Sequence, residues 1–188
     1  MCSFCFAAGA KTEQLNFLEQ LSISDGLAHN GVTTILEDSQ GFIWFGTYDG
    51  LNRYDGYHFD TFKNTPTKNI LHSNRIRSLY EDANGDIWIG TDEGLSVLRY
   101  ASESFENIDL NDNDIAAKLK RPVIRQILQP GSGLICVTEN AGILVLDTNL
   151  MLTDQYKMSE RHSSEIRFFE IVKISDQHFI VGSNHGLF

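Results

Sequence analysis

The apolar residues of this 188-residue chain fall into short runs separated by polar turns. The segment Val32–Glu37 is rich in β-branched residues, a composition typical of a strand. Phe42–Thr47 is almost continuously apolar, so we expect a strand that is covered on both faces. Leu51–Tyr54 and the alternating run Tyr57–Phe62 follow after glycine-containing turns. The pattern predicts a unit of four antiparallel strands joined by short turns.

The same unit recurs along the chain. Gly41–Leu51 returns without a gap as Gly85–Leu95, 44 positions later, with identical residues at seven of eleven positions. Two weaker copies follow at Gly133–Ile143 and Gln177–Leu187. A four-stranded antiparallel unit repeated at this period is typical of a propeller blade. We therefore predict an all-β fold of about four β-propeller blades, forming an incomplete propeller.

Tryptophan and glycine mark fixed positions of the repeat. A small sheet with two apolar faces cannot bury both alone, so neighbouring blades must cover them, and tryptophan fills the gap between sheets. Glycine allows tight turns and close backbone approach. The positions assigned to this structural role are Trp44, Gly46, Gly50, Trp88, Gly90 and Gly94. In the weaker copies Cys136 and Ile180 keep the tryptophan position apolar, and we expect Cys136 to be a small buried hydrophobic residue.

The repeats and the flanking composition divide the chain into six segments. They are a signal-peptide tail at 1–10, an N-terminal strand region at 11–20, blade 1 at 21–70, blade 2 at 71–110, a degenerate blade 3 at 111–155 and a partial blade 4 at 156–188. The first segment is short and apolar and ends in Ala8-Gly9-Ala10, a small-x-small pattern suited to signal peptidase. A plain N-terminal tail is the alternative for it. No apolar run approaches the ~20 residues of a membrane helix, so we expect membrane attachment only through segments outside this chain.

Charge and motifs exclude several classes of function. The chain has 25 acidic and 15 basic residues and a net charge of −10, and no run of Lys and Arg exceeds Lys118–Arg121. This argues against binding of a nucleic-acid backbone, which needs a concentrated positive face. The histidines and cysteines lack zinc spacing, and the acidic segment Asp82–Glu93 has Ile87 where a calcium loop needs glycine. No nucleophile elbow, phosphate loop or dinucleotide fingerprint occurs. We expect no catalytic residues, no metal and no cofactor.

The long string from Asp25 to Gly56, with Asp38, Trp44 and the Gly-Leu-Asn-Arg-Tyr-Asp-Gly ending, resembles the two-component regulator propeller repeat. The resemblance is close over 21–108 and fades over 122–188. It implies an extracytoplasmic sensing domain of a histidine kinase, hybrid two-component protein or diguanylate cyclase, of which this chain looks like an N-terminal fragment. Some relatives sense oligosaccharides. The resemblance thus implies a periplasmic location and a membrane-anchored parent receptor that signals, with a homodimer formed through that receptor as one expectation.

Propeller geometry indicates where a ligand would bind. The turn between the second and third strands shares a face with the loop that enters the next innermost strand, and these polar segments differ between copies while the scaffold does not. The candidate ligand-binding residues are His29, Asn30, Tyr48, Asp49, Asn74, Arg75 and Asp92. A polar, partly aromatic rim suits a carbohydrate or another small polar ligand. Ordinary solvated turns are the alternative interpretation.

The leading functional hypothesis is a non-catalytic, ligand-sensing propeller region of a bacterial signal-transduction receptor. Three alternatives stay open. One is a propeller-type enzyme whose catalytic residues lie in blades outside this chain, and the second is a protein-interaction scaffold, which would show a wide exposed patch. The third is a fragment without a function of its own, which would aggregate or pair through its uncovered blade faces.

Overall fold

The computed structural model describes residues 20–110, 121–157, 166–175 and 178–188. In these ranges the chain forms one short 3-10 helix and fifteen strands, which are grouped into four antiparallel sheets. Blade 1 contains β1 (Val32–Glu37), β2 (Ile43–Thr47), β3 (Gly50–Tyr54) and β4 (Phe59–Phe62). Blade 2 contains β5 (Ile76–Glu81), β6 (Ile87–Thr91), β7 (Leu95–Arg99) and β8 (Ser104–Ile108).

The two weaker repeats form the remaining sheets. Blade 3 contains β9 (Ile124–Leu128), β10 (Leu134–Thr138), β11 (Ile143–Leu146) and β12 (Leu152–Tyr156). Blade 4 contains β13 (Phe168–Ser175), β14 (His178–Ser183) and β15 (Gly186–Leu187), and so has three strands in the described part. Within each sheet the strands are paired in chain order. The predicted all-β fold of propeller blades is confirmed.

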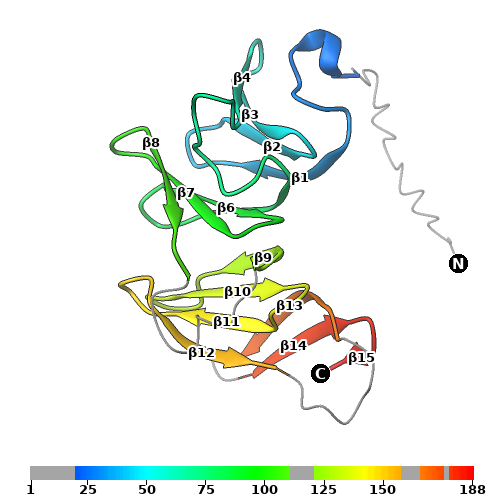
Figure 1. Ribbon diagram of the computed structural model, residues 1–188, viewed down its shortest axis with the longest axis vertical. Helices are drawn as coiled ribbons and strands as arrows, with labels where there is room; N and C mark the ends of the chain where they lie inside the picture. Colours follow the sequence, from blue (N-terminus) through cyan, green and yellow to red (C-terminus); the bar gives the residue numbers. More distant parts are fainter. Residues whose placement is uncertain (1–19, 111–120, 158–165, 176–177) are drawn as a thin grey trace, which may run out of the picture.

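Blade 1 lies at the top of Figure 1, blade 2 below it, and blades 3 and 4 together in the lower part. Their first strands, β1, β5, β9 and β13, form the inner row, in which each contacts the next. The second strand of each blade also packs on the first strand of the following blade. The start and the end of each inner strand therefore lie at opposite faces of the assembly.

Each hydrophobic cluster is a layer between two blades. Trp44 on β2 packs with Ile76, Ile87 and Leu98 of blade 2, and Trp88 on β6 packs with Ile124 and other residues of blade 3. Both tryptophans are buried, at 2% and 3% exposed. Burial of a large apolar side chain stabilises a fold by about 1.5–3 kcal/mol, so these layers hold the blades together. Trp44 and Trp88 thus lie between neighbouring sheets.

A carboxylate next to each tryptophan completes this arrangement. Asp38 accepts hydrogen bonds from its own turn and, through Oδ2, from Trp44 Nε1 at 2.7 Å. Asp82 does the same for its turn and for Trp88 Nε1 at 3.0 Å. A buried indole N–H needs an acceptor, which explains why the aspartate recurs with the tryptophan.

The Gly-Thr-x-x-Gly part of the repeat forms a turn between the second and third strands, and the polar groups of this turn form hydrogen bonds with one another. Thr47 Oγ1 donates to the Gly50 carbonyl at 2.8 Å and accepts from the backbone N–H of Asp49. The same pair of bonds recurs at Thr91 and Ser183. In blade 3 the turn is one residue longer, and Thr138 Oγ1 donates to the Gly142 carbonyl and accepts from the backbone N–H of Ala141. Gly50 has φ 129°, a left-handed conformation that other residues rarely adopt.

Gly46 and Gly90 are required by close approach of the next blade. A Cβ at Gly46 would lie 2.7 Å from Ile76 Cγ2, and one at Gly90 would lie 2.8 Å from the carbonyl oxygen of Ile124. These two isoleucines begin the inner strands of blades 2 and 3, so the glycines set the spacing between blades.

Two features at the edges of the described chain complete the fold. Ser22 and Asp25 form a capping box around the 3-10 helix η1 (Ile23–Asp25), and Gly26 ends it with φ 112°. The signal-peptide tail predicted at 1–10 and most of the strand region predicted at 11–20 lie outside the described residues. The described part has no blade packed against the outer side of blade 1 or blade 4, and it exposes Ile35, Val172, Ile174 and Ile180 there.

Candidate functional site

The turns between second and third strands lie beside the starts of the inner strands. The backbone N–H of Tyr48 donates to the Gly31 carbonyl, and that of Asp92 donates to the Arg75 carbonyl at 3.1 Å. The same bond recurs from Glu139 to Val123 and from Asn184 to Arg167. The turn of blade 1 also touches the loop that enters blade 2, since Gly50 N–H donates to the Asn74 carbonyl at 2.8 Å. We call this end of the blades the rim.

Tyr48 is the aromatic centre of the blade 1 part of the rim. Its side chain is 43% exposed, and its ring meets His29 edge-on at 5.8 Å between ring centroids. The guanidinium groups of Arg75 and Arg77 lie over the ring at 5.3 and 5.7 Å. Gly31 leaves room for this ring, because a Cβ there would lie 2.5 Å from Tyr48 Cδ2. An aromatic face flanked by arginines results.

Asp92 fixes both arginines. It pairs with Arg75 at 3.2 Å and with Arg77, whose Nη2 donates to Oδ2 at 3.0 Å. Arg77 lies on β5 and is only 16% exposed. The hydrogen bonds to Asp92 raise the pKa of Arg77 above its ordinary value, so the guanidinium stays charged.

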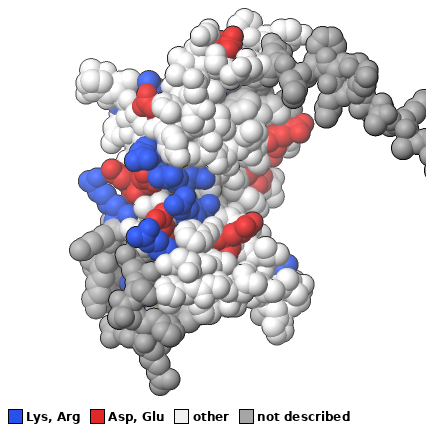
Figure 2. Space-filling model, turned by 90° about the vertical axis from the view of Figure 1, so that its right-hand side faces the viewer, with Lys and Arg blue, Asp and Glu red and all other residues white. Residues whose placement is uncertain are grey.

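The ion pairs continue along the rim into blades 3 and 4. Arg121 pairs with Glu93, and Arg125 on β9 pairs with Glu139. Arg167, at the start of blade 4, reaches back to Glu139 at 3.4 Å. Figure 2 shows Lys and Arg side chains gathered on one face with acidic side chains between them.

The rim therefore has an excess of positive charge in an acidic chain. Its ion pairs join six cationic side chains to four carboxylates, and the cations are Lys63, Arg75, Arg77, Arg121, Arg125 and Arg167. The net charge of the whole chain is −10, so this concentration is local. Arginine donors next to an aromatic face suit carboxylates and hydroxyl groups of a polar ligand.

Most of the predicted site residues come together at this rim. His29, Tyr48, Arg75 and Asp92 form the cluster described above. Asp49 pairs with Lys63 at 3.0 Å and accepts a long bond from Asn74. The side chain of Asn74 is also hydrogen-bonded to Asn64, which gives it a role within the loop. Asn30 Oδ1 accepts a hydrogen bond from the backbone N–H of Ile23 at 2.9 Å, which gives this side chain a role in holding the segment around η1.

Sequence reasoning missed Arg77, Arg125 and Glu139. The signal was present, since Ile76-Arg77 and Ile124-Arg125 occupy equivalent places at the starts of two inner strands. An arginine repeated next to a fully buried isoleucine at the start of an inner strand indicates a position with the same role in both blades.

Metal-binding and nucleophilic side chains are the other candidates for function in the described ranges. These ranges contain no group of three or more His, Cys, Asp or Glu side chains placed to hold a metal ion. Cys136 is fully buried, and burial raises the pKa of its thiol to about 12, which keeps it protonated and inert. The rim carboxylates are held by arginines, an arrangement that suits binding.

Comparisons with known proteins fit this geometry. The family model described as two component regulator propeller matches residues 26–49 and 70–93, the first strands and turns of blades 1 and 2. Blades 1 and 2 thus each contain a stretch that matches the two component regulator propeller repeat. The matched stretches contain the Asp-Trp pair and the glycine that contacts the next blade, and each ends one residue before the glycine of the Thr-x-x-Gly turn.

Two named proteins are also similar to this chain. The protein named histidine kinase P4 from Formosa agariphila is 38% identical over 61 residues, which is 32% of this chain and 4% of the kinase. The extracellular domain of a protein named as the hybrid two component system BT3049 from B. thetaiotaomicron is 29% identical, with a TM-score of 0.72. That likeness covers 87% of this chain and 23% of the solved domain.

A second solved domain is similar in fold. The extracellular domain of BT4673 from B. thetaiotaomicron, named as a one component system, is 22% identical with a TM-score of 0.70 over 88% of this chain and 24% of that chain. The chain thus spans about a quarter of the solved propeller domains that it matches. Among the described residues, no helix is long and apolar enough to cross a membrane.

Proposed function

We propose that this chain is part of a non-catalytic, ligand-sensing propeller in the periplasmic region of a bacterial signal-transduction receptor. The observation that carries the proposal is the likeness at 29% identity, over 87% of the chain, to the extracellular domain of a protein named as a hybrid two component system. The repeat match in blades 1 and 2 supports the same class.

The rim is the proposed ligand site. Its scaffold repeats from blade to blade, while the side chains on it differ, as expected where a rigid frame carries a specific surface. Tyr48 offers an exposed aromatic face, and the arginines around Asp92 offer donors that are already oriented by ion pairs. We propose a carbohydrate or another small polar ligand that carries hydroxyl or acidic groups.

Calorimetric titration of the protein with neutral and acidic oligosaccharides tests this proposal. Tyr48→Ala and Arg75→Gln should each weaken binding about tenfold, since a stacked ring or a charge-assisted bond contributes on the order of 1–2 kcal/mol. Lys173→Gln removes one positive charge at the other end of β13 and serves as the control. Equal binding by Tyr48→Ala, Arg75→Gln and the control would remove the rim from the proposal.

A propeller enzyme is the second candidate carried from the sequence. It would require turnover of a bound ligand, so the same titrations should be followed by chromatography of the ligand after incubation. Recovery of unchanged ligand from a protein that binds it supports sensing, and a cleaved product would overturn the non-catalytic assignment.

A further inference from the structure

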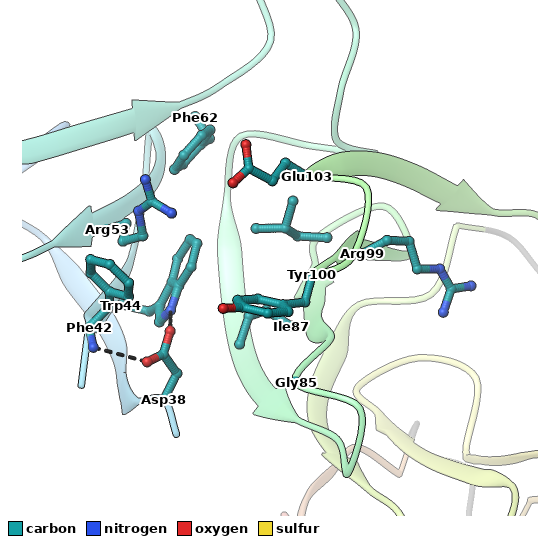
Figure 3. A pocket seen from close by; sticks show the side chains of 11 residues that line it. Asp38, Phe42, Trp44, Arg53, Phe62, Gly85, Ile87, Arg99, Tyr100 and Glu103 are labelled. Atoms are coloured by element: carbon teal, nitrogen blue, oxygen red, sulfur yellow. Dashed lines mark hydrogen bonds between the residues drawn. The ribbon is translucent and has the colours of Figure 1, made fainter. Parts of the chain in front are cut away.

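A hollow lies between blades 1 and 2, away from the rim. It has a volume of about 130 Å³ and opens near the turns at the other end of the strands. On one side it is lined by Trp44 and its neighbours, and on the other by Ile87 and the turn that joins β7 to β8 (Figure 3). The side chains that matter below are Phe42, Trp44, Arg53, Phe62, Tyr100 and Glu103. We call it the blade 1–2 hollow.

The blade 1 wall of this hollow is aromatic and fixed. Trp44 stacks on Phe62 with 5.9 Å between ring centroids, and the Arg53 guanidinium lies 4.8 Å from the Phe42 centroid. Asp38 accepts from the indole N–H, as the dashed line in Figure 3 marks. The rings therefore do not need to rearrange to receive a ligand, which lowers the entropy that binding costs.

The blade 2 wall places one carboxylate at this aromatic surface. Glu103 is the last residue of the turn Tyr100–Glu103 and has φ 50°, a conformation in which glycine or asparagine is expected. Its carboxylate points across the hollow toward the side that holds Arg53 and Phe62 (Figure 3). Within the described residues, no hydrogen bond or ion pair engages this carboxylate.

The surrounding charges favour a cation. Arg53 is paired with Asp60, and Arg99 is paired with both Asp86 and Glu106. The cations near the hollow are thus already neutralised by carboxylates, whereas the charge of Glu103 is not. Glu103 is exposed at the mouth of the hollow, and a carboxylate beside aromatic faces favours an organic cation.

We propose that the blade 1–2 hollow binds a single-ring organic cation, with the ring against Trp44 and Phe62 and the charged nitrogen at Glu103. The size fits one ring, because an apolar cavity of about 150 Å³ accepts benzene. The proposal is independent of the rim and of the polar ligand proposed there.

The comparison with the next pair of blades supports a specific role. By the 44-residue offset of the repeat, Phe42 corresponds to Asp86. By strand register, Arg53 and Phe62 correspond to Val97 and Ile108 of blade 2. The hollow there, between blades 2 and 3, has a volume of about 180 Å³ and a lining that includes Gln129, Ser132, Asp147 and Thr148. A hollow thus results from blade packing at both interfaces. Among the described residues, the combination of several aromatic rings with a carboxylate that no hydrogen bond or ion pair engages occurs in the blade 1–2 hollow and not in the hollow between blades 2 and 3.

Titration of the protein with benzylammonium, benzyl alcohol and benzoate tests the proposal, with calorimetry and tryptophan fluorescence as readouts. Benzylammonium should bind about tenfold more tightly than benzyl alcohol, and benzoate should bind more weakly than both, because one carboxylate adds or subtracts a charge interaction at the ring. Equal affinity for all three, or tighter binding of benzoate, would overturn the proposal.

Two variants locate the site. Glu103→Gln should remove the preference for benzylammonium over benzyl alcohol, and Phe62→Leu should weaken both by a similar factor. Asp154→Asn, an exposed carboxylate change on β12, is the matched control and should leave all affinities unchanged. If Glu103→Gln keeps the preference, the cation is bound elsewhere and the assignment is wrong. None of these outcomes depends on whether the rim binds an oligosaccharide.

Discussion

The interface between blades 1 and 2 and the interface between blades 2 and 3 have one frame and two different linings. Both use an aspartate that binds a tryptophan indole, at 2.7 Å in Asp38–Trp44 and 3.0 Å in Asp82–Trp88. Both place a glycine of the second strand against the isoleucine that begins the next blade. Both leave a hollow, of about 130 and 180 Å³ respectively.

The linings have opposite polarity at a matched position. The turns between third and fourth strands, Tyr100–Glu103 and Asp147–Leu150, each end in a residue with positive φ, 50° for Glu103 and 63° for Leu150. That residue is a carboxylate in the aromatic hollow and an apolar side chain in the more polar one. The comparison indicates that the repeat fixes the spacing of the blades, while the side chains that face the hollows are free to differ.

The largest effect is expected from the glycines that set this spacing. Gly90→Ala should lower the free energy of unfolding by about 3 kcal/mol, since overpacking costs 1–3 kcal/mol or more and the new Cβ would lie 2.8 Å from a backbone oxygen of Ile124. Gly46→Ala should cost about 1–2 kcal/mol, because its neighbours, Thr34 and Ile76, meet it with side-chain atoms that can shift. Urea unfolding measures both. Equal losses of unfolding free energy would mean that the atoms around the new Cβ shift equally well at the two interfaces.

Much of the fold could be predicted from such positions. The glycines, the Thr-x-x-Gly turn and the buried tryptophans each meet a local structural requirement that can be recognised directly in the sequence. In blade 3 the tryptophan becomes Cys136, and the matching aspartate becomes Gln129, two residues after the strand partner of Cys136. Without an indole N–H to satisfy, the carboxylate has no buried partner, which explains why the two positions change together.

The site was predicted only in part, for a physical reason. Four of the predicted residues lie in turns, which are recognised in a sequence by their composition: His29, Tyr48, Arg75 and Asp92. Arg77 and Arg125 lie inside strands, where a long charged side chain is normally taken for the solvent face. Which face of an inner strand points to the central axis depends on how the blades pack. Asn30 is the converse case, a polar turn residue whose side-chain oxygen accepts a hydrogen bond from a backbone N–H.

The next largest effect should come from the indole acceptors. Asp82→Ala should cost about 2–3 kcal/mol, because a buried N–H left without a partner costs 1–3 kcal/mol and the bonds of the turn are lost as well. Asp38→Ala should cost about 1–2 kcal/mol, since Asp38 is less buried and water can replace some of its bonds. In a Trp88→Phe background the cost of Asp82→Ala should fall, and a cost that stays the same would contradict the indole pairing.

The smallest effect, and the sharpest test of the matched turns, concerns the residues with positive φ. A left-handed conformation costs a non-glycine residue roughly 1–2 kcal/mol, so Glu103→Gly should raise the free energy of unfolding by about 1 kcal/mol, because its carboxylate has no bond to lose within the described chain. Leu150→Gly relieves the same strain but removes apolar contacts with the core between blades 2 and 3, so no gain is expected. Thermal unfolding of both variants measures the difference. A gain in stability of similar size at both positions would show that the two hollows differ less than their linings indicate. A gain confined to Glu103→Gly would mean that the protein keeps a destabilising residue at an aromatic surface, as expected of a residue that is retained for binding.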